Sequence, residues 1–354
     1  MVLSRRQFLL QGGAVALSLA LPLPSRAAVN GKHASLLAAW QLPTAVYQVG
    51  VLSWKNTRLS TPYTIDSAVD LPTRPHGLMH LQGDEYLVIA RRPGDWIMRL
   101  NIQTGDTART WQDEDRHLNG HSAVHGDCLF TTETDVLTGQ GVLGVRHRET
   151  FELLDVWPTQ GRDPHEMLVL PGGVLGIDEP FLLVANGGIQ THADMGRTQL
   201  NHLPMDSSVV AMHPRTGRVL NQWTLRDSRL SLRHMAVHAS GVVGIAMQAH
   251  HAVEADQEAA PVLALLDEQG LRPVAESIGV NGYAGDIATT PEGFVISCTK
   301  NDSAAQFDLQ GKLLNTQQAK AACALASRGG EVWLGHQAGE DKNSFALDNH
   351  WLLI

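Results

Sequence analysis

The sequence has few cysteines and lacks the short motifs that identify common enzyme and metal-binding classes. Its 354 residues include 3 cysteines, Cys128, Cys298 and Cys323, whose wide spacing matches no disulfide-rich scaffold and no structural zinc motif. They fit either one disulfide with a free thiol or three free thiols. The chain has no Gly-x-Ser-x-Gly elbow, P-loop, His-Glu-x-x-His helix or Cys-x-x-Cys-His haem site. No local motif therefore assigns a catalytic residue.

The sequence also lacks an apolar run of membrane-spanning length. The best candidate, Leu9–Leu21, is too short for a bilayer and is interrupted by two adjacent glycines. It follows Ser4-Arg5-Arg6-Gln7-Phe8-Leu9-Leu10 and precedes the small-x-small pattern Ser25-Arg26-Ala27. We therefore expect residues 1–27 to be a twin-arginine export signal, and residues 28–354 to form a single soluble periplasmic domain without a membrane span.

Positive charge is scarce as well. Lysine and arginine number 27 against 36 aspartates and glutamates, which gives a formal net charge of -9. Cleavage of the signal removes three more arginines and leaves about -12. A chain this acidic is poorly suited to phosphate contacts, so we expect no nucleic-acid partner.

A short phrase recurs along the chain: a leading residue, an apolar segment and a glycine turn. The clearest copy is Arg74-Pro75-His76-Gly77-Leu78-Met79-His80-Leu81-Gln82-Gly83. In five of six copies the turn glycine lies seven residues after the leading residue, and in the copy at His121 it lies five residues after it. The leading residues of the six copies are His76, His121, His165, His234, Asp286 and Cys323. Each of these side chains can bind a metal ion.

The repeats predict an all-β fold. No long helical pattern follows the signal, and each phrase is followed by a hairpin with a tight turn, as in Met98–Asp106. A fixed order of strands at intervals of about 40 to 70 residues is typical of a β-propeller blade, whereas a β-sandwich would not need the same phrase six times. The six copies, with Gly31–Leu71 as a further unit, predict a seven-bladed β-propeller. Because Ser344–Ile354 has room for only one strand, we expect the N-terminal segment to complete the final blade, so that N-terminal and C-terminal strands close the ring.

In a propeller the first strand of each blade lines the central axis, so the leading residues should meet at one mouth of the channel. Four aligned histidines among 17 exceed what chance alignment predicts, and several buried imidazoles lose hydration that a ligand would restore. Imidazole suits transition metals better than calcium or magnesium. We expect a site for iron or copper, with zinc as a further candidate, whose ligands are His76, His121, His165, His234 and Asp286.

Further side chains are candidates to contact the ligand or to support the metal ligands. Arg74 and Arg233 shortly precede two of the histidines and favour a metal-bound anion, or they pair with nearby carboxylates. Glu166 could bind the metal or orient an imidazole. Two long polar insertions should lie over the channel mouth. The full set of candidates is Arg74, Glu166, Asn186, His192, Arg233, His250 and Cys323.

Several stretches together resemble a known family. They are the export signal, Asp163-Pro164-His165-Glu166, Ala185-Asn186-Gly187-Gly188-Ile189-Gln190-Thr191-His192, Met195-Gly196-Arg197 and Leu232-Arg233-His234-Met235-Ala236-Val237. Over essentially its whole length the chain resembles a bacterial family of twin-arginine-exported periplasmic β-propeller proteins, encoded beside imelysin-type peptidases and di-haem thiol oxidoreductases in iron-uptake clusters. The resemblance implies a role in iron handling, with other periplasmic iron-uptake proteins as partners. It brings no established activity.

Three functions stay open from the sequence. The first is a periplasmic propeller that holds a transition-metal ion or a metal complex at the histidine ring for iron uptake or metal trafficking. The second is a metal-dependent periplasmic hydrolase or oxidoreductase that uses the same site. The third is a metal-free propeller that binds partner proteins. Three protein ligands with an open position would favour catalysis, whereas four or more would favour binding.

Overall fold

Antiparallel β-strands make up nearly all of the regular structure. A computed structural model describes residues 33–54, 63–189, 205–274, 280, 282–336 and 345–354. The predicted export signal and His192 lie outside the described residues. Within the described ranges the helices are short, α1 (Glu254–Ala259) and the 3-10 turn η2 (Thr299–Asn301). None of them is long and apolar enough to cross a membrane.

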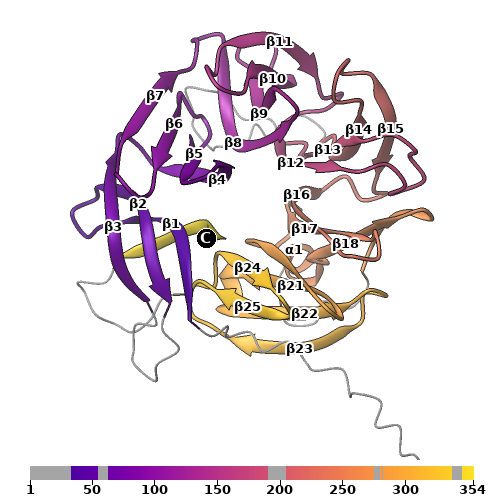
Figure 1. Cartoon of the computed structure of the whole chain (residues 1–354). Helices are drawn as coiled ribbons and strands as arrows, with labels where there is room; N and C mark the ends of the chain where they lie inside the picture. Colours follow the sequence, from indigo (N-terminus) through magenta and orange to yellow (C-terminus); the bar gives the residue numbers. More distant parts are fainter. Residues whose placement is uncertain (1–32, 55–62, 190–204, 275–279, 281, 337–344) are drawn as a thin grey trace, which may run out of the picture.

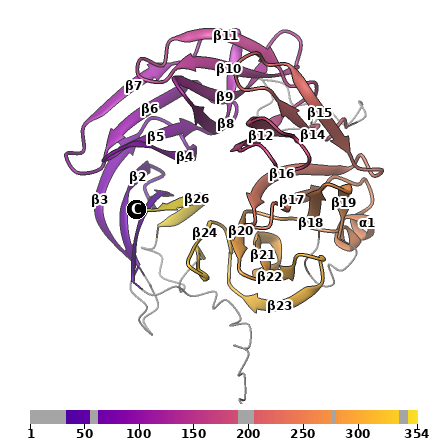
Figure 2. The ribbon, with the colours of Figure 1, turned by 45° about the vertical axis from the view of Figure 1, so that its right-hand side comes forward.

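The described residues form six four-stranded sheets, which are the blades of a propeller around a central axis (Figure 1, Figure 2). Five blades each contain four strands that are consecutive in the chain. They are β4 (Pro75–Gln82), β5 (Glu85–Ala90), β6 (Trp96–Asn101) and β7 (Thr107–Trp111); β8 (Arg116–His125), β9 (Cys128–Asp135), β10 (Gly141–His147) and β11 (Leu153–Pro158); β12 (Pro164–Leu170), β13 (Phe181–Asn186), β14 (Ser208–Met212) and β15 (Val219–Thr224); β16 (Leu230–Val237), β17 (Val243–Ala249), β18 (Leu263–Asp267) and β19 (Gly270–Pro273); β20 (Ile287–Thr290), β21 (Gly293–Cys298), β22 (Ser303–Asp308) and β23 (Leu313–Gln318).

The sixth blade joins the two ends of the chain. Its strand order is β26, β1, β2 and β3. The antiparallel pairing of β26 with β1 places Trp351 opposite Ala38, and both residues are buried. Strands from the two ends of the chain therefore pair, but the C-terminal strand completes the first unit of the chain instead of the N-terminal segment completing the last. The strands of this blade are β1 (Ala34–Gln41), β2 (Tyr47–Trp54), β3 (Tyr63–Leu71) and β26 (Ala346–Leu353).

The prediction of seven blades is wrong, because the last repeat does not form a four-stranded sheet. The copy that begins at Cys323 supplies the hairpin of β24 (Leu325–Arg328) and β25 (Glu331–Leu334), a two-stranded sheet in the described part of the chain. We expected the N-terminal segment to complete this unit. Instead, the C-terminal strand joins β1 to β3, and one strand cannot complete two blades. The fold is therefore a six-bladed propeller with a hairpin between β20 and β26.

Burial explains how the strands are arranged in each blade. Central strands such as β13 and β21 are buried along their whole length, as an apolar strand covered on both faces should be. Outer strands such as β7 and β15 are polar and mostly exposed, which protects the sheet edges from further pairing. The innermost strands β4, β8, β12, β16, β20, β24 and β26 contact one another in succession around the axis. Side chains from these strands can therefore meet although they are far apart in the chain.

Candidate metal centre

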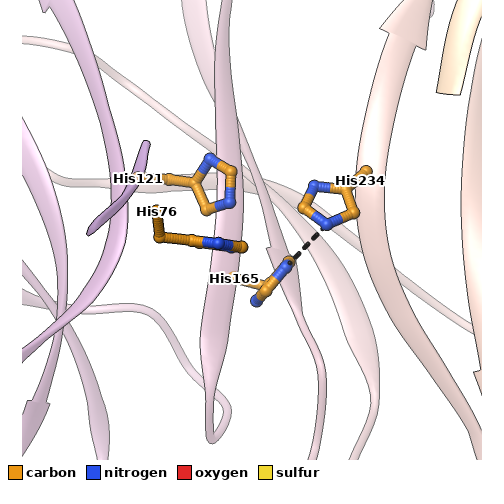
Figure 3. Close-up of side chains that lie close together, drawn as sticks. All are labelled: His76, His121, His165 and His234. Atoms are coloured by element: carbon orange, nitrogen blue, oxygen red, sulfur yellow. Dashed lines mark hydrogen bonds between the residues drawn. The ribbon is translucent and has the colours of Figure 1, made fainter. Parts of the chain in front are cut away.

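Four of the predicted metal-binding residues meet near the axis. His76 on β4, His121 on β8, His165 on β12 and His234 on β16 are all buried, and their rings face one another (Figure 3). Their ring centroids are separated by 4.5 Å for His165 and His234 and by up to 5.9 Å for His76 and His234. One ring nitrogen from each histidine lies within 4.8 Å of the others. These four residues, called the four-histidine group below, converge as the repeat predicts. Their role as metal ligands stays a prediction.

A β-bulge positions each of the four histidines. The pairing register between the innermost strand and its neighbour shifts at every one of these positions. The shifts lie between Pro75 and Leu78, Leu118 and Ser122, Pro164 and Met167, and Leu232 and Met235. An extra residue in one strand bends it and redirects a side chain. The bulge therefore explains how a residue of an inner strand can aim its imidazole at the axis.

Two glycines let the bulges of β4 and β8 touch. Gly120 has a φ of +105°, and a Cβ atom there would lie 2.6 Å from Cδ2 of His76. A Cβ atom at Gly77 would lie 2.1 Å from the carbonyl oxygen of Gly120. Both separations are too short for a real contact, so the spacing of His76 and His121 depends on glycine at both places.

A fifth imidazole, that of His350, completes the cluster, and the sequence analysis missed it. Its centroid lies 4.4 Å from that of His234, 4.7 Å from that of His76 and 5.1 Å from that of His121. His350 lies on β26 at a further register shift, between Leu347 and Trp351. It has no glycine turn after it and so does not fit the repeated phrase. The signal that could have found it is the expected closure, which places the C-terminal strand beside the others.

Burial keeps the four-histidine group uncharged. Loss of hydration lowers the pKa of His76, His121, His165 and His234 well below 6.5, and neighbouring imidazoles and arginines lower it further. Neutral imidazole is the form that binds metal ions. His350 differs. Burial acts to lower its pKa, but the carboxylates of Asp286, Glu166 and Asp348 outweigh burial and raise it above 6.5.

Hydrogen bonds fix where the protons of two histidines lie. Nη1 of Arg233 lies 3.2 Å from Nδ1 of His165 and can only donate, so Nδ1 accepts and the His165 proton is on Nε2. Nε2 of His165 lies 3.0 Å from Nε2 of His234 and donates to it (Figure 3). The proton of neutral His234 is therefore on Nδ1, 3.7 Å from Oε2 of Glu166. The other imidazoles of the cluster have no comparable hydrogen-bond chain among the described residues.

A buried carboxylate holds Arg233 in place. Oδ2 of Asp163 lies 3.3 Å from Nη1 of Arg233, and Oδ1 contacts Arg92. Gly187 packs against this carboxylate, because a Cβ atom there would lie 2.7 Å from Oδ2. The Asn-Gly-Gly stretch that the sequence analysis singled out thus supports Asp163 and, through Arg233, the orientation of His165. The backbone N–H of Gly187 also donates to the carbonyl of Asp163 at 2.7 Å.

Glu166 faces the cluster from the same bulge as His165. Its Oε2 accepts a hydrogen bond from the backbone N–H of Met235. Burial raises the pKa of Glu166 to about 7, although the Met235 N–H acts in the opposite direction. A carboxylate beside His234 is well placed to orient that imidazole or to bind an ion next to it.

The other two leading residues have different surroundings. Asp286 precedes β20, where the register with β21 is regular, and its carboxylate accepts hydrogen bonds from the N–H groups of Ile287 and Leu325. It forms a separate group with His234 and His350 whose ligand atoms lie within 4.8 Å of one another. Cys323 lies in the apolar core, and burial raises its pKa to about 12. All three cysteines are free thiols. The side chain of Cys323 packs between the terminal blade and the β24–β25 hairpin and donates to the carbonyl of Gly335, so its contact with a ligand stays a prediction.

Three further candidates have other partners. Arg74 forms an ion pair with Asp348, with 2.7 Å between Nε and Oδ2. Asn186 donates to the carbonyl of Thr159 at 2.9 Å and to the hydroxyl of Ser208 at 3.1 Å, so it links its own blade to the connection that precedes β12. The pKa of His250 is lowered to about 3, first by burial and then by Arg233 and Arg92. The described structure does not place these three side chains in the four-histidine group.

A small cavity borders the histidines on the arginine side. Arg91, Arg92 and Arg233 line it together with His76, His165 and His234. Its volume is about 20 Å³, which is room for roughly one water molecule. The cavity is too small for a macrocycle or another large organic ligand.

A comparison with models of protein families identifies the family of this chain. Residues 69–354 match the model of a family described as Protein of unknown function (DUF1513). The chain belongs to the DUF1513 family. No curated protein matches the sequence.

Solved structures with a similar fold are distant in sequence. The hydrazine synthase of Kuenenia stuttgartiensis is 13% identical with a TM-score of 0.56, covering 90% of this chain and 99% of that chain. The Dos1 propeller is 10% identical with a TM-score of 0.51, covering 88% and 80% of the two chains. Sqt1 of Saccharomyces cerevisiae is 10% identical with a TM-score of 0.50, covering 88% and 82%. At these identities the likeness concerns the propeller fold alone.

Proposed function

We propose that this DUF1513 protein binds at least one transition-metal ion between the imidazoles of the four-histidine group. The observation that carries the proposal is the convergence of four buried histidines with ligand nitrogens within 4.8 Å of one another. Metal–nitrogen bonds of about 2.0–2.1 Å place two ligands of one ion roughly 3.3 to 4 Å apart, so a small contraction would form the site. The Nε2 atoms of His165 and His234 are already 3.0 Å apart. Metal binding at Nε2 of His165 releases its ring proton to solvent, and the Nδ1 atom of the resulting imidazolate continues to accept from Arg233.

Unpartnered nitrogens support a ligand. Both ring nitrogens of His76, Nε2 of His121, Nδ1 of His234 and Nε2 of His350 are buried without a hydrogen bond. Each unsatisfied buried polar atom costs about 1–3 kcal/mol. A metal ion would satisfy several of these atoms at once. The same feature weighs against a metal-free interaction propeller, which gives no reason for several imidazoles to be stripped of partners.

The surroundings favour a bare ion over a metal complex. The adjoining cavity of about 20 Å³ admits a water molecule or a similarly small ligand, and three arginines line it. A small anion bound to the metal would suit this charge. Iron or copper is our first assignment and zinc the second, because an all-imidazole donor set suits these ions.

The number of donors favours holding an ion over hydrolysing a substrate. Four imidazoles surround the site and a fifth, His350, lies beside them. A catalytic site usually keeps an open position next to three protein ligands. We therefore propose metal binding or trafficking as the primary role. The export motif and the family resemblance support a periplasmic location and a link to iron uptake, which cell fractionation and growth under iron limitation would test.

Metal analysis of purified mature protein tests the binding proposal. The wild type and the variants His121→Ala, His165→Ala and His125→Ala are purified without a histidine tag, and bound metals are measured by mass spectrometry. His125 lies on β8 four residues after His121 and outside the cluster, so His125→Ala is the matched control. We expect stoichiometric metal in the wild type and the control and at least a tenfold loss in the other two variants. Equal metal content in all four proteins would refute the proposal.

A further inference from the structure

We infer that the cluster holds two metal ions, with the second bound by His234, Asp286 and His350 and with His234 shared between the ions. This inference rests on the proposed function, because one of its ligands belongs to the four-histidine group. The described residues contain two groups with metal-binding geometry, and His234 is the member they have in common. In this proposal Nε2 of His234, which faces His165, serves the four-histidine group, and Nδ1 is left for the second group.

The two nitrogens of His234 have different neighbours. Nε2 lies 3.0 Å from Nε2 of His165 and faces the four-histidine group. Nδ1 has no hydrogen-bond partner and lies 3.7 Å from Oε2 of Glu166. An imidazole that binds one ion through each nitrogen has lost its ring proton, which passes to solvent when the second ion binds. The His234 side chain is only 2% exposed to bulk solvent.

The second donor set is nearly assembled. Nδ1 of His350 lies 3.3 Å from Oδ2 of Asp286, close to the separation of two ligands on one tetrahedral ion. The ring of His350 lies 4.4 Å from that of His234, and its Nε2 is buried without a partner. Backbone N–H groups of Ile287 and Leu325 hold the Asp286 carboxylate in place. Glu166 is close enough to His234 to supply a further oxygen.

The donor types distinguish the two sites. The four-histidine group offers neutral imidazoles, whereas the second group adds the carboxylate of Asp286 and has that of Glu166 nearby. These negative charges offset the charge of a second divalent ion a short distance from the first. A mixed set of imidazole and carboxylate ligands suits zinc, iron or manganese, while the all-imidazole set also suits copper.

The competing interpretation is that Asp286 only orients His350 around a single ion. Carboxylates often accept a hydrogen bond from a metal-bound histidine in this way. Metal stoichiometry separates the two interpretations, because an orienting carboxylate changes affinity at one site without adding an ion.

The test is titration of metal-free mature protein with Cu²⁺ alone, and with Zn²⁺ alone, followed by removal of loosely bound ions and metal analysis. Asp286→Asn and His350→Gln change the second group, and His121→Ala changes the first. Asp267→Asn is the control, since this aspartate ends β18, belongs to neither group and pairs with Arg272 at 2.7 Å. Circular dichroism and thermal unfolding of each variant check that it folds.

We expect two ions per chain in the wild type and in Asp267→Asn, and one in Asp286→Asn and in His350→Gln. Two Cu²⁺ ions bridged by one imidazole couple magnetically, so the wild-type electron paramagnetic resonance signal should be weak and should recover in Asp286→Asn. One ion in the wild type, lost in His121→Ala and retained in Asp286→Asn, would overturn the second site and leave the proposed function standing. No bound ion in the wild type would overturn both.

Discussion

The innermost strands fall into two kinds, although the sequence gives them the same repeated phrase. In β4, β8, β12 and β16 a register shift accompanies the leading histidine, and its imidazole faces the axis. In β20 and β24 the pairing is regular, and Asp286 and Cys323 bind backbone groups or pack in the core. β26 lacks the phrase but contains a register shift and supplies His350. A register shift therefore accompanies every imidazole of the cluster, whereas Asp286 reaches His350 beside a strand of regular pairing.

The largest expected effect comes from closing a bulge. In Gly120→Ala the new Cβ atom would meet the His76 ring at 2.6 Å on a backbone with φ +105°. We expect a loss of stability of about 3 kcal/mol or more, from strain and overpacking together, and loss of metal binding. Urea denaturation and metal analysis measure the two effects.

Gly126→Ala is the control for this substitution. Gly126 also has a positive φ, +59°, but no atom lies within 4 Å of its added Cβ. It should cost only about 1 kcal/mol and leave metal binding intact. Equal effects of the two substitutions would mean that backbone conformation matters and contact between the bulges does not.

Acid should destabilise the metal-free protein through the bulged strands. The unfolded chain protonates its histidines below about pH 6.5, whereas the four-histidine group resists protonation because its pKa values are lowered. The stability that these histidines contribute is therefore fully present above about pH 6.5. It decreases as the pH is lowered, by up to about 1.4 kcal/mol per pH unit for each histidine. His121→Gln should reduce this slope in urea denaturation at several pH values.

His350 should act in the opposite direction. Its pKa is raised, so its contribution to stability is present below about pH 6.5 and is lost as the pH rises through its pKa in the folded protein. His350→Gln should therefore steepen the loss of stability on acidification. If neither His121→Gln nor His350→Gln changed the dependence of stability on pH, the opposite pKa shifts of the two histidines would be contradicted.

A substitution of Glu166 tests the side chain that follows His165 in the bulge of β12. Glu166→Gln removes a negative charge 3.7 Å from Nδ1 of His234 while keeping an acceptor for the Met235 N–H. We expect metal affinity to fall about 10–100-fold, measured by competition with a chelator. Glu179→Gln, which alters a surface ion pair with Arg218, should leave the affinity unchanged. Equal affinity of both variants would show that the carboxylate does not act on the site.

The smallest expected effect is that of Cys323→Ala. Because Cys323 packs in the core of an unbulged region, its loss should cost about 1 kcal/mol of stability and leave metal content unchanged. A loss of metal in this variant would mean that the leading position matters even without a bulge.

Much of the fold and most of the candidate site could be predicted from the sequence. The repeat established the all-β propeller and the convergence of His76, His121, His165 and His234, because side chains at equivalent positions of repeated units meet at the axis. The sequence did not predict the number of blades, since nothing in Ser344–Ile354 says which neighbour its single strand will pair with. That choice depends on long-range packing, such as Trp351 opposite Ala38.

His350 and the separate role of Asp286 could not be read from the pattern either. A bulge is a property of two paired strands, and the phrase around Asp286 looks like the others until its regular pairing with β21 is known. His350 belongs to no repeat, so its place beside His234 depends entirely on ring closure.

The most direct test of the central claim is anomalous scattering from crystals of the mature protein, measured across the iron, copper and zinc absorption edges. The account predicts a metal peak between His76, His121, His165 and His234, about 2.0–2.2 Å from their ring nitrogens. A metal-loaded protein with no peak there, or with its peaks only at surface histidines, would contradict it.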